Sequence, residues 1–150
     1  MMLVGRYMLN MGVIEITTRL LIARMQGTYG TAVVNADLDA RIRFIRKSFP
    51  RGDEARHKWA MNALGAARKH VGFRNIVAHS PLAFTGHPED GSRIRLQVDG
   101  SSRIQGILNV TSNPPELISL EELTGRVNES ARVARDLMEM ETEVPVSWPP

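Results

Sequence analysis

Apolar side chains recur every three or four residues along most of this chain, and this spacing predicts a mainly helical protein. Pro50, Gly52 and Pro81 interrupt the pattern, so they separate the expected helices. We expect an antiparallel bundle of about four helices in one domain, residues 1–142, followed by a proline-rich tail, residues 143–150. The expected helices cover residues 2–26, about 38–49, about 54–79 and about 120–142.

Three of these helices have a recognisable start. Asn35 or Asp37 can cap the second helix, and Asp53 can cap the third. Ser119, followed three residues later by Glu122, forms a capping box for the last helix.

A β-hairpin is expected before the last helix. Apolar and polar residues alternate from Arg93 to Val98, and a second apolar run begins at Ile104. Asp99-Gly100 between the two runs is a typical hairpin turn. The polar face of the first run carries Arg93 and Arg95, which either contact a nucleic-acid backbone or keep an edge strand from aggregating. The second interpretation is favoured.

The composition of the 150 residues excludes several kinds of chemistry. There is no cysteine, which excludes disulfides, thiolate zinc sites and thiol catalysis and is compatible with the cytoplasm. The four histidines form no metal-binding motif, and no phosphate-binding glycine loop is present, so we expect neither a metal nor a cofactor. Charged residues interrupt the apolar N-terminal stretch, so we expect no membrane span.

Charge is distributed unevenly along the chain. Residues 39–74 hold ten Lys or Arg and three acidic residues, whereas residues 116–143 hold three Arg and eight acidic residues. The basic part suits a polyanion such as RNA. It could equally be a solvated helix surface, or pair with the acidic last helix. The candidate RNA-binding residues are Arg41, Arg43, Arg46, Lys47, Arg93 and Arg95.

The most distinctive stretch lies at the end of the third helix, where Arg74, Asn75 and His79 fall within six residues. A guanidinium is suited to phosphate oxygens, and an imidazole can exchange protons near neutral pH. In a helix Asn75 and His79 share a face. The alternative is structural, with Arg74 and Asn75 satisfying a helix end and His79 acting as a cap favoured by the helix dipole.

Glu15 is a further candidate for this site. The first helix has an apolar seam through Val4, Met8, Met11, Thr18 and Ile22, and Glu15 lies on that seam. A carboxylate in an apolar stripe needs a partner, because burying an unpaired charge is costly. Either Glu15 lies at the edge of the seam and reaches water, or it meets Arg74 or another arginine across the bundle.

The sequence Arg74-Asn75-x-x-Ala78-His79, at the end of a helical pattern, resembles the Arg-x4-His signature of the HEPN superfamily. The resemblance implies a helical domain acting as a metal-independent endoribonuclease of the toxin or defence type. It also implies a homodimer whose site combines Arg and His from both protomers, with an antitoxin or regulatory protein as a further partner. In this interpretation the catalytic residues are Arg74, Asn75, His79 and Glu15.

Two alternatives belong to other classes. The chain could be a non-catalytic, dimeric helical module that binds nucleotides or a protein, as some relatives in that superfamily do. It could also be a structural bundle in which the motif is a coincidence. The intact Arg74 and His79 favour the enzyme.

Overall fold

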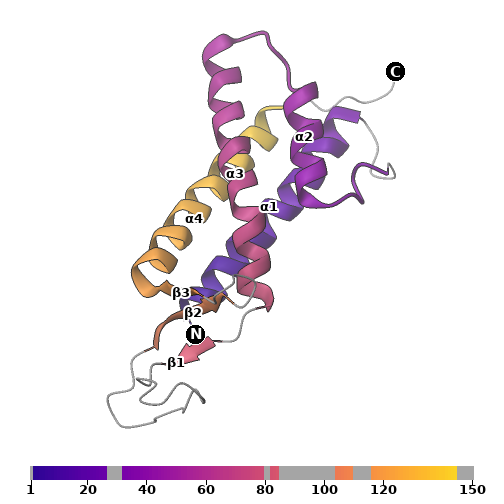
Figure 1. The fold of residues 1–150 in the computed structure, drawn as a ribbon. Coiled ribbons are helices and arrows are strands. Elements are labelled where there is room, and N and C mark those ends of the chain that lie inside the picture. Colours follow the sequence, from indigo (N-terminus) through magenta and orange to yellow (C-terminus); the bar gives the residue numbers. More distant parts are fainter. Residues whose placement is uncertain (1, 27–31, 80–81, 85–103, 110–115, 145–150) are drawn as a thin grey trace.

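Helices dominate the part of the chain that the structure describes. The computed structural model describes residues 2–26, 32–79, 82–84, 104–109 and 116–144. Its helices are α1 (Met2–Gln26), α2 (Leu38–Ser48), α3 (Glu54–His79) and α4 (Leu120–Glu143), as Figure 1 shows. The mainly helical fold and the four helices predicted from the sequence are therefore confirmed. Of the predicted tail, residues 145–150 lie outside the described residues.

The predicted start of each of the last three helices is also correct. Asp37 precedes α2, Asp53 precedes α3 and Ser119 precedes α4. Each side-chain oxygen accepts a hydrogen bond from the backbone N–H three residues later, at 2.8, 3.0 and 3.1 Å, respectively. Each cap therefore satisfies an N–H group that the first helical turn leaves unpaired.

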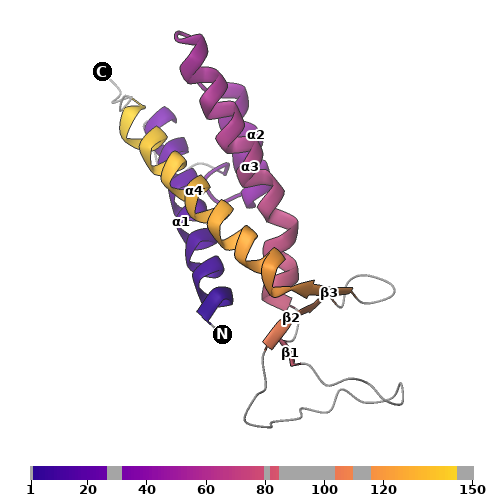
Figure 2. The ribbon, with the colours of Figure 1, turned by 90° about the vertical axis from the view of Figure 1, so that its left-hand side faces the viewer.

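The directions of the helices differ from the predicted antiparallel bundle, because α1 and α4 run parallel. Near its start α1 meets the first half of α4, where Asn10 donates to the Val127 carbonyl at 3.2 Å. Near its end it meets the end of α4, where Arg24 pairs with Glu141. Figures 1 and 2 show both helices leaving the end of the molecule where the strands lie. The cause is the return connection through the strands, which starts α4 where α3 ends.

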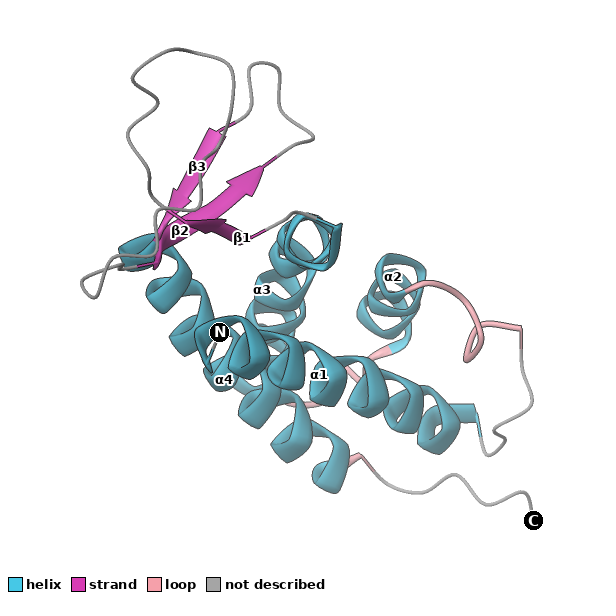
Figure 3. Cartoon of the chain, turned by 90° about the horizontal axis from the view of Figure 1, so that it is seen from below, coloured by secondary structure: helices cyan, strands magenta, loops and turns pink. Residues whose placement is uncertain are grey.

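Helix α3 is antiparallel to α4, and α2 folds back along α3. Arg56 at the start of α3 pairs with Glu139 near the end of α4, at 3.6 Å. Arg68 of α3 donates to Asp39 of α2 at 2.6 Å. Figure 3 shows the result from below, with α1 and α4 on one side of the bundle and α2 and α3 on the other.

The buried core lies between these two helix pairs. In α1 the buried face runs through Tyr7, Met11, Ile14 and Leu21. Met11, Thr18 and Ile22 of the predicted seam are buried, so that part of the prediction is confirmed. Val4 and Met8 are only partly buried and pack at the border of the core, which also includes Tyr7 and Ile14. The other helices contribute Ile42 and Ile45 from α2, Ala60, Ala63, Leu64 and Ala67 from α3, and Leu123, Val127, Val133 and Leu137 from α4.

Three short strands close the end of the bundle between α3 and α4. They are β1 (Leu82–Phe84), β2 (Ile104–Asn109) and β3 (Glu116–Ser119), in antiparallel order β1-β2-β3. Ile118 of β3 is buried, and Ser119 both ends β3 and caps α4. The sheet thus fixes where α4 begins.

The predicted hairpin needs correction. Its second run is strand β2, but β2 pairs with β1 and β3. Gly106 and Ile107 already have partners on both sides, so they offer no free edge to the first run. That run and its Asp99-Gly100 turn lie outside the described residues.

Candidate functional site

The candidate motif occupies the last two turns of α3, at the end of the bundle next to the strands. Phe73 and Val77, four residues apart, are buried in the core. The helical repeat turns the intervening residues outward, so Arg74 is partly exposed and Asn75 exposed. The sequence therefore anchors this turn through its apolar positions and leaves the polar ones at the surface.

Arg74 is held by two acceptors. Its Nη2 lies 3.2 Å from Oε1 of Glu15 on α1, and its Nη1 donates to Oδ1 of Asn75 at 3.2 Å. The Arg74 side chain remains 36% exposed and the Glu15 side chain 26% exposed, so both charges keep contact with water. The predicted pairing of Glu15 with Arg74 is confirmed. Glu15 also lies at the edge of the buried face, as the alternative interpretation held.

A guanidinium carries five N–H donors in a planar fork. Glu15 and Asn75 each engage one terminal nitrogen, and this fixes the orientation of the fork. An oriented, partly exposed fork is the arrangement that bidentate recognition of a phosphate requires.

His79 is the last residue of α3, one helical turn beyond Asn75. Its side chain lies outside what the structure describes. Whether its imidazole approaches Arg74 or Asn75 therefore stays a prediction.

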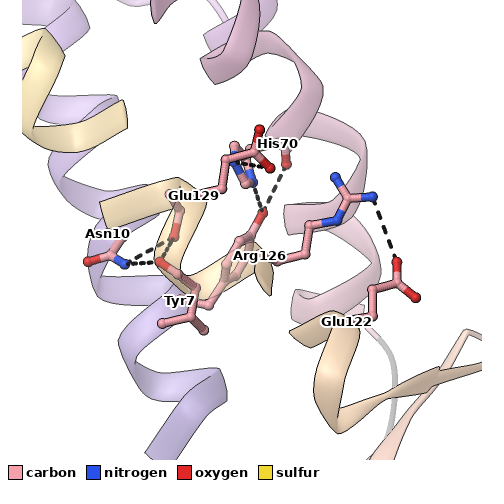
Figure 4. A network of polar contacts seen from close by, with 8 residues as sticks. Tyr7, Asn10, His70, Glu122, Arg126 and Glu129 are labelled. Carbon is pink, nitrogen blue, oxygen red and sulfur yellow. Dashed lines mark hydrogen bonds and ion pairs between the residues drawn. The ribbon is translucent and has the colours of Figure 1, made fainter. Parts of the chain in front are cut away.

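A buried polar network that the sequence patterns did not predict includes His70, one helical turn before Arg74 on α3. Figure 4 shows this network. Tyr7 of α1 and His70 of α3 are both fully buried. The Tyr7 hydroxyl lies 3.3 Å from Nδ1 of His70 and donates to the His70 backbone carbonyl at 3.2 Å. On the other side of the ring, Nε2 lies 3.6 Å from Oε2 of Glu129, which is too long for a hydrogen bond.

Burial governs the protonation of this pair. It lowers the pKa of His70, and Glu129 only partly opposes that effect. Burial also raises the pKa of Tyr7. His70 is therefore a neutral imidazole and Tyr7 a neutral phenol at neutral pH.

Arg126 of α4 covers the same region from the other side. Its guanidinium lies 5.0 Å from the centre of the Phe73 ring, and the Phe73 ring meets that of Tyr7 edge to face at 5.1 Å. Glu122 lies 3.7 Å from Arg126. Phe73, the residue before Arg74, thus packs between the Tyr7 ring of α1 and the Arg126 guanidinium of α4.

One signal in the sequence could have located His70. It continues the spacing of the buried residues Ala60, Ala63 and Ala67, each three or four positions apart. A histidine on that face needs a polar partner, but the pattern does not say which helix supplies it.

The candidate RNA-binding residues fall into three groups. Arg41 is only 2% exposed and donates to the Thr18 hydroxyl and to the Ala36 carbonyl, at 3.2 and 2.6 Å. Its assignment as an RNA contact was therefore wrong, because a buried guanidinium cannot reach a backbone phosphate. Arg43 is exposed but paired with Asp39, and Arg46 and Lys47 are exposed. Arg93 and Arg95 lie outside the described residues.

Among the described residues, no three His, Asp or Glu side chains lie close enough together to hold a metal ion. None of the helices in this part of the chain combines the length and apolar character needed to cross a membrane. Comparison with protein-family models, with curated proteins and with solved structures gives no match.

Proposed function

We propose that this protein is a metal-independent endoribonuclease of the toxin or defence type, with its site at the end of α3. The observation that carries the proposal is the Arg74 guanidinium, which Glu15 and Asn75 hold at the surface one turn before His79. The HEPN-like motif supplies the expectation of activity.

The proposed chemistry uses the nucleophile that RNA itself carries. The 2′-OH loses its proton to a base and attacks the adjacent phosphorus, and the bond to the 5′-oxygen breaks as that oxygen takes up a proton. The products are a 2′,3′-cyclic phosphate and a 5′-OH. Such a reaction needs proton transfer and stabilisation of the negative charge that develops on the phosphorane oxygens.

Each residue has one role in this proposal. His79 transfers a proton, Arg74 neutralises the phosphorane oxygens, and Asn75 hydrogen-bonds the phosphate or orients His79. Glu15 is a positioning residue that acts through Arg74. By resemblance to HEPN proteins, a second copy of the chain supplies the second imidazole. Arg46 and Lys47, exposed on α2, are the described candidates for contacts to the RNA backbone.

A non-catalytic, dimeric helical module that binds nucleotides or a protein is the second candidate. The observation that favours it is the same ion pair, because Glu15 already compensates the charge of Arg74. In that case Arg74 would mainly tie α1 to α3. The two candidates differ in whether RNA is cut.

The test is RNA cleavage by purified protein in the presence of EDTA. We expect cleavage to persist, to leave a 2′,3′-cyclic phosphate and to stop when the scissile nucleotide is 2′-deoxy. His79→Ala should lower the rate by about 10²- to 10⁴-fold, the usual contribution of a positioned acid or base. Arg74→Lys should also lower it strongly, because an ammonium cannot replace a planar fork.

Matched controls are available on the same helices. His57→Ala changes a histidine near the start of α3, and Arg132→Lys changes an exposed arginine on α4. Both variants should cut at the wild-type rate. Intact RNA across many substrates, or an unaffected His79→Ala variant, would reject the ribonuclease. Binding of RNA or nucleotide without cleavage would support the helical module.

A further inference from the structure

Helix α1 has a second apolar face, which points away from the core. Met2, Leu9 and Ile16 are 74%, 71% and 57% exposed. They are seven residues apart, so they lie along one side of the helix, and we call them the outer stripe. The buried Tyr7 and Ile14 are each two positions from a stripe residue, which puts them on the opposite side.

Helix α4 extends this apolar surface. The contacts between the two parallel helices join residues that are 117 to 120 positions apart, so Met138 lies level with Leu20. Met138 is 53% exposed, and Leu20 is half-buried. Val13 and Ala131, both half-buried, lie level with each other in the same way. The exposed and half-buried apolar residues of α1 and α4 thus lie at matching levels along the α1–α4 pair, and these two helices form one side of the bundle in Figure 3.

Two glycines lie beside the outer stripe. Gly5 and Gly12 are also seven residues apart, and a Cβ atom added to either would meet nothing within 4 Å. A glycine inside a helix destabilises it by about 1 kcal/mol relative to alanine. No contact within the described chain requires that loss, whereas a second backbone approaching α1 closely would require it.

We propose that a second copy of this chain packs on this surface, with α1 against α1. The same helix carries a ridge, Met2, Leu9 and Ile16, and a groove, Gly5 and Gly12, with the same seven-residue repeat. The ridge of one copy can pack into the groove of the other and the reverse. This suits a two-fold symmetric contact, in which each copy contributes the same patch.

The area also suits a second copy. The exposed parts of Met2, Leu9, Ile16 and Met138 amount to on the order of 500 Å², near the upper end for the largest patch on a monomer. Two copies would bury on the order of 1,000 Å², the size at which specific interfaces begin. The partly buried residues at the rim add to this.

This interface differs from one formed by α3, yet it lies beside the candidate site. Gly12 is one helical turn from both Ile16 and Glu15. A copy seated in the glycine groove therefore comes next to the pair of Glu15 and Arg74. The proposal itself does not depend on RNA cleavage, because it concerns association alone.

Sedimentation equilibrium at micromolar concentration tests the proposal. Wild type should be a dimer, and the double variant Leu9→Glu/Ile16→Glu should raise its Kd by more than about tenfold, since charges would be desolvated at the centre of the contact. Asn62→Glu, at an exposed position of α3, should leave the Kd unchanged. Circular dichroism should show equal helix content in all three proteins.

A second measurement uses the absence of cysteine from the chain. Leu9→Cys, at the middle of the outer stripe, should form an intermolecular disulfide under mild oxidation, and Asn62→Cys should not. A monomeric wild type, or a dimer that survives Leu9→Glu/Ile16→Glu, would overturn the proposal. So would a monomer that binds phosphatidylglycerol vesicles through the same residues, because the surface would then face a membrane.

Discussion

Glu15 of α1 compensates the charge of Arg74 at the surface of α3. The two side chains are 36% and 26% exposed, so desolvation costs little and the Coulomb attraction is correspondingly modest. The main physical effect is orientation, since Asn75 takes a second terminal nitrogen of the same guanidinium. A charge held in this way can serve stability, phosphate binding or both.

We expect Glu15→Gln to lower the free energy of unfolding by about 1 kcal/mol, because Arg74 then loses its only carboxylate among the described residues. Glu121→Gln changes an exposed acid in the first turn of α4 and should cost at most about 0.5 kcal/mol. Urea unfolding of both variants makes the comparison.

A double-mutant cycle separates the ion pair from other effects. Combining Glu15→Gln with Arg74→Gln should give a coupling energy of about 0.5–1 kcal/mol. A coupling of zero, with equal losses in the Glu15 and Glu121 variants, would mean that the pair contributes nothing to stability.

Among the elements, helix starts were predictable from the sequence, whereas the buried face of α1 was predictable only in part. Asp37, Asp53 and Ser119 cap their helices through local bonds to residues three positions later, so the local sequence contains the whole signal. The face of α1 is different. Apolar residues occur almost all round this helix, and periodicity alone cannot say which side meets the core. Of the predicted seam, Met11, Thr18 and Ile22 are buried and Val4 and Met8 only partly so, whereas the seam does not include the buried Tyr7 and Ile14.

In the candidate site, too, some features were predictable from the sequence and others were not. The Glu15–Arg74 pair was predictable, because a carboxylate on an apolar seam calls for a cation. The burial of Arg41 was not, since its acceptors are Thr18 on α1 and the Ala36 carbonyl before α2. Nothing within α2 distinguishes Arg41 from its exposed neighbour Arg46.

Because Arg41 is buried and Arg46 is exposed, we expect their replacement to affect the stability of the protein differently. Arg41→Ala should destabilise the protein by about 2–4 kcal/mol, because it leaves a cavity and removes the hydrogen bonds to Thr18 on α1 and to the Ala36 carbonyl before α2. Arg46→Ala should change stability by no more than about 0.5 kcal/mol. Thermal unfolding followed by circular dichroism measures both, and similar midpoints for the two variants would contradict the structural role of Arg41.

At the scale of the molecule, the strands decide how the helices are arranged. The sheet returns the chain to the end of α3, so α4 starts there and runs parallel to α1. Helical periodicity contains no information about direction, and a bundle with short connections would have been antiparallel. Tyr7, His70 and Glu129 meet where α1, α3 and α4 come together, and this junction depends on the parallel arrangement (Figure 4).

The junction should make the stability of the whole molecule depend on pH. Burial lowers the pKa of His70 below its ordinary value of 6.5, Glu129 opposes this shift and Arg126 adds to it. Between that lowered pKa and 6.5 the unfolded chain therefore binds more protons than the folded protein. The free energy of unfolding must then rise with pH across this window. The contribution of His70 to stability is fully present above pH 6.5 and is lost as the pH falls toward the lowered pKa of the folded protein.

We expect wild type to lose stability as the pH falls below 6.5, and His70→Gln to lose much less, since glutamine keeps polar contacts but does not titrate. Urea unfolding at several pH values measures the difference. Glu129→Gln should enlarge the loss at the acid end, because it removes the carboxylate that favours the imidazolium. Asp39, whose pKa is lowered by hydrogen bonds from Arg43 and then Arg68, affects stability only as the pH falls below its ordinary value of 3.8. Parallel losses in wild type and His70→Gln would show that another group controls the pH dependence.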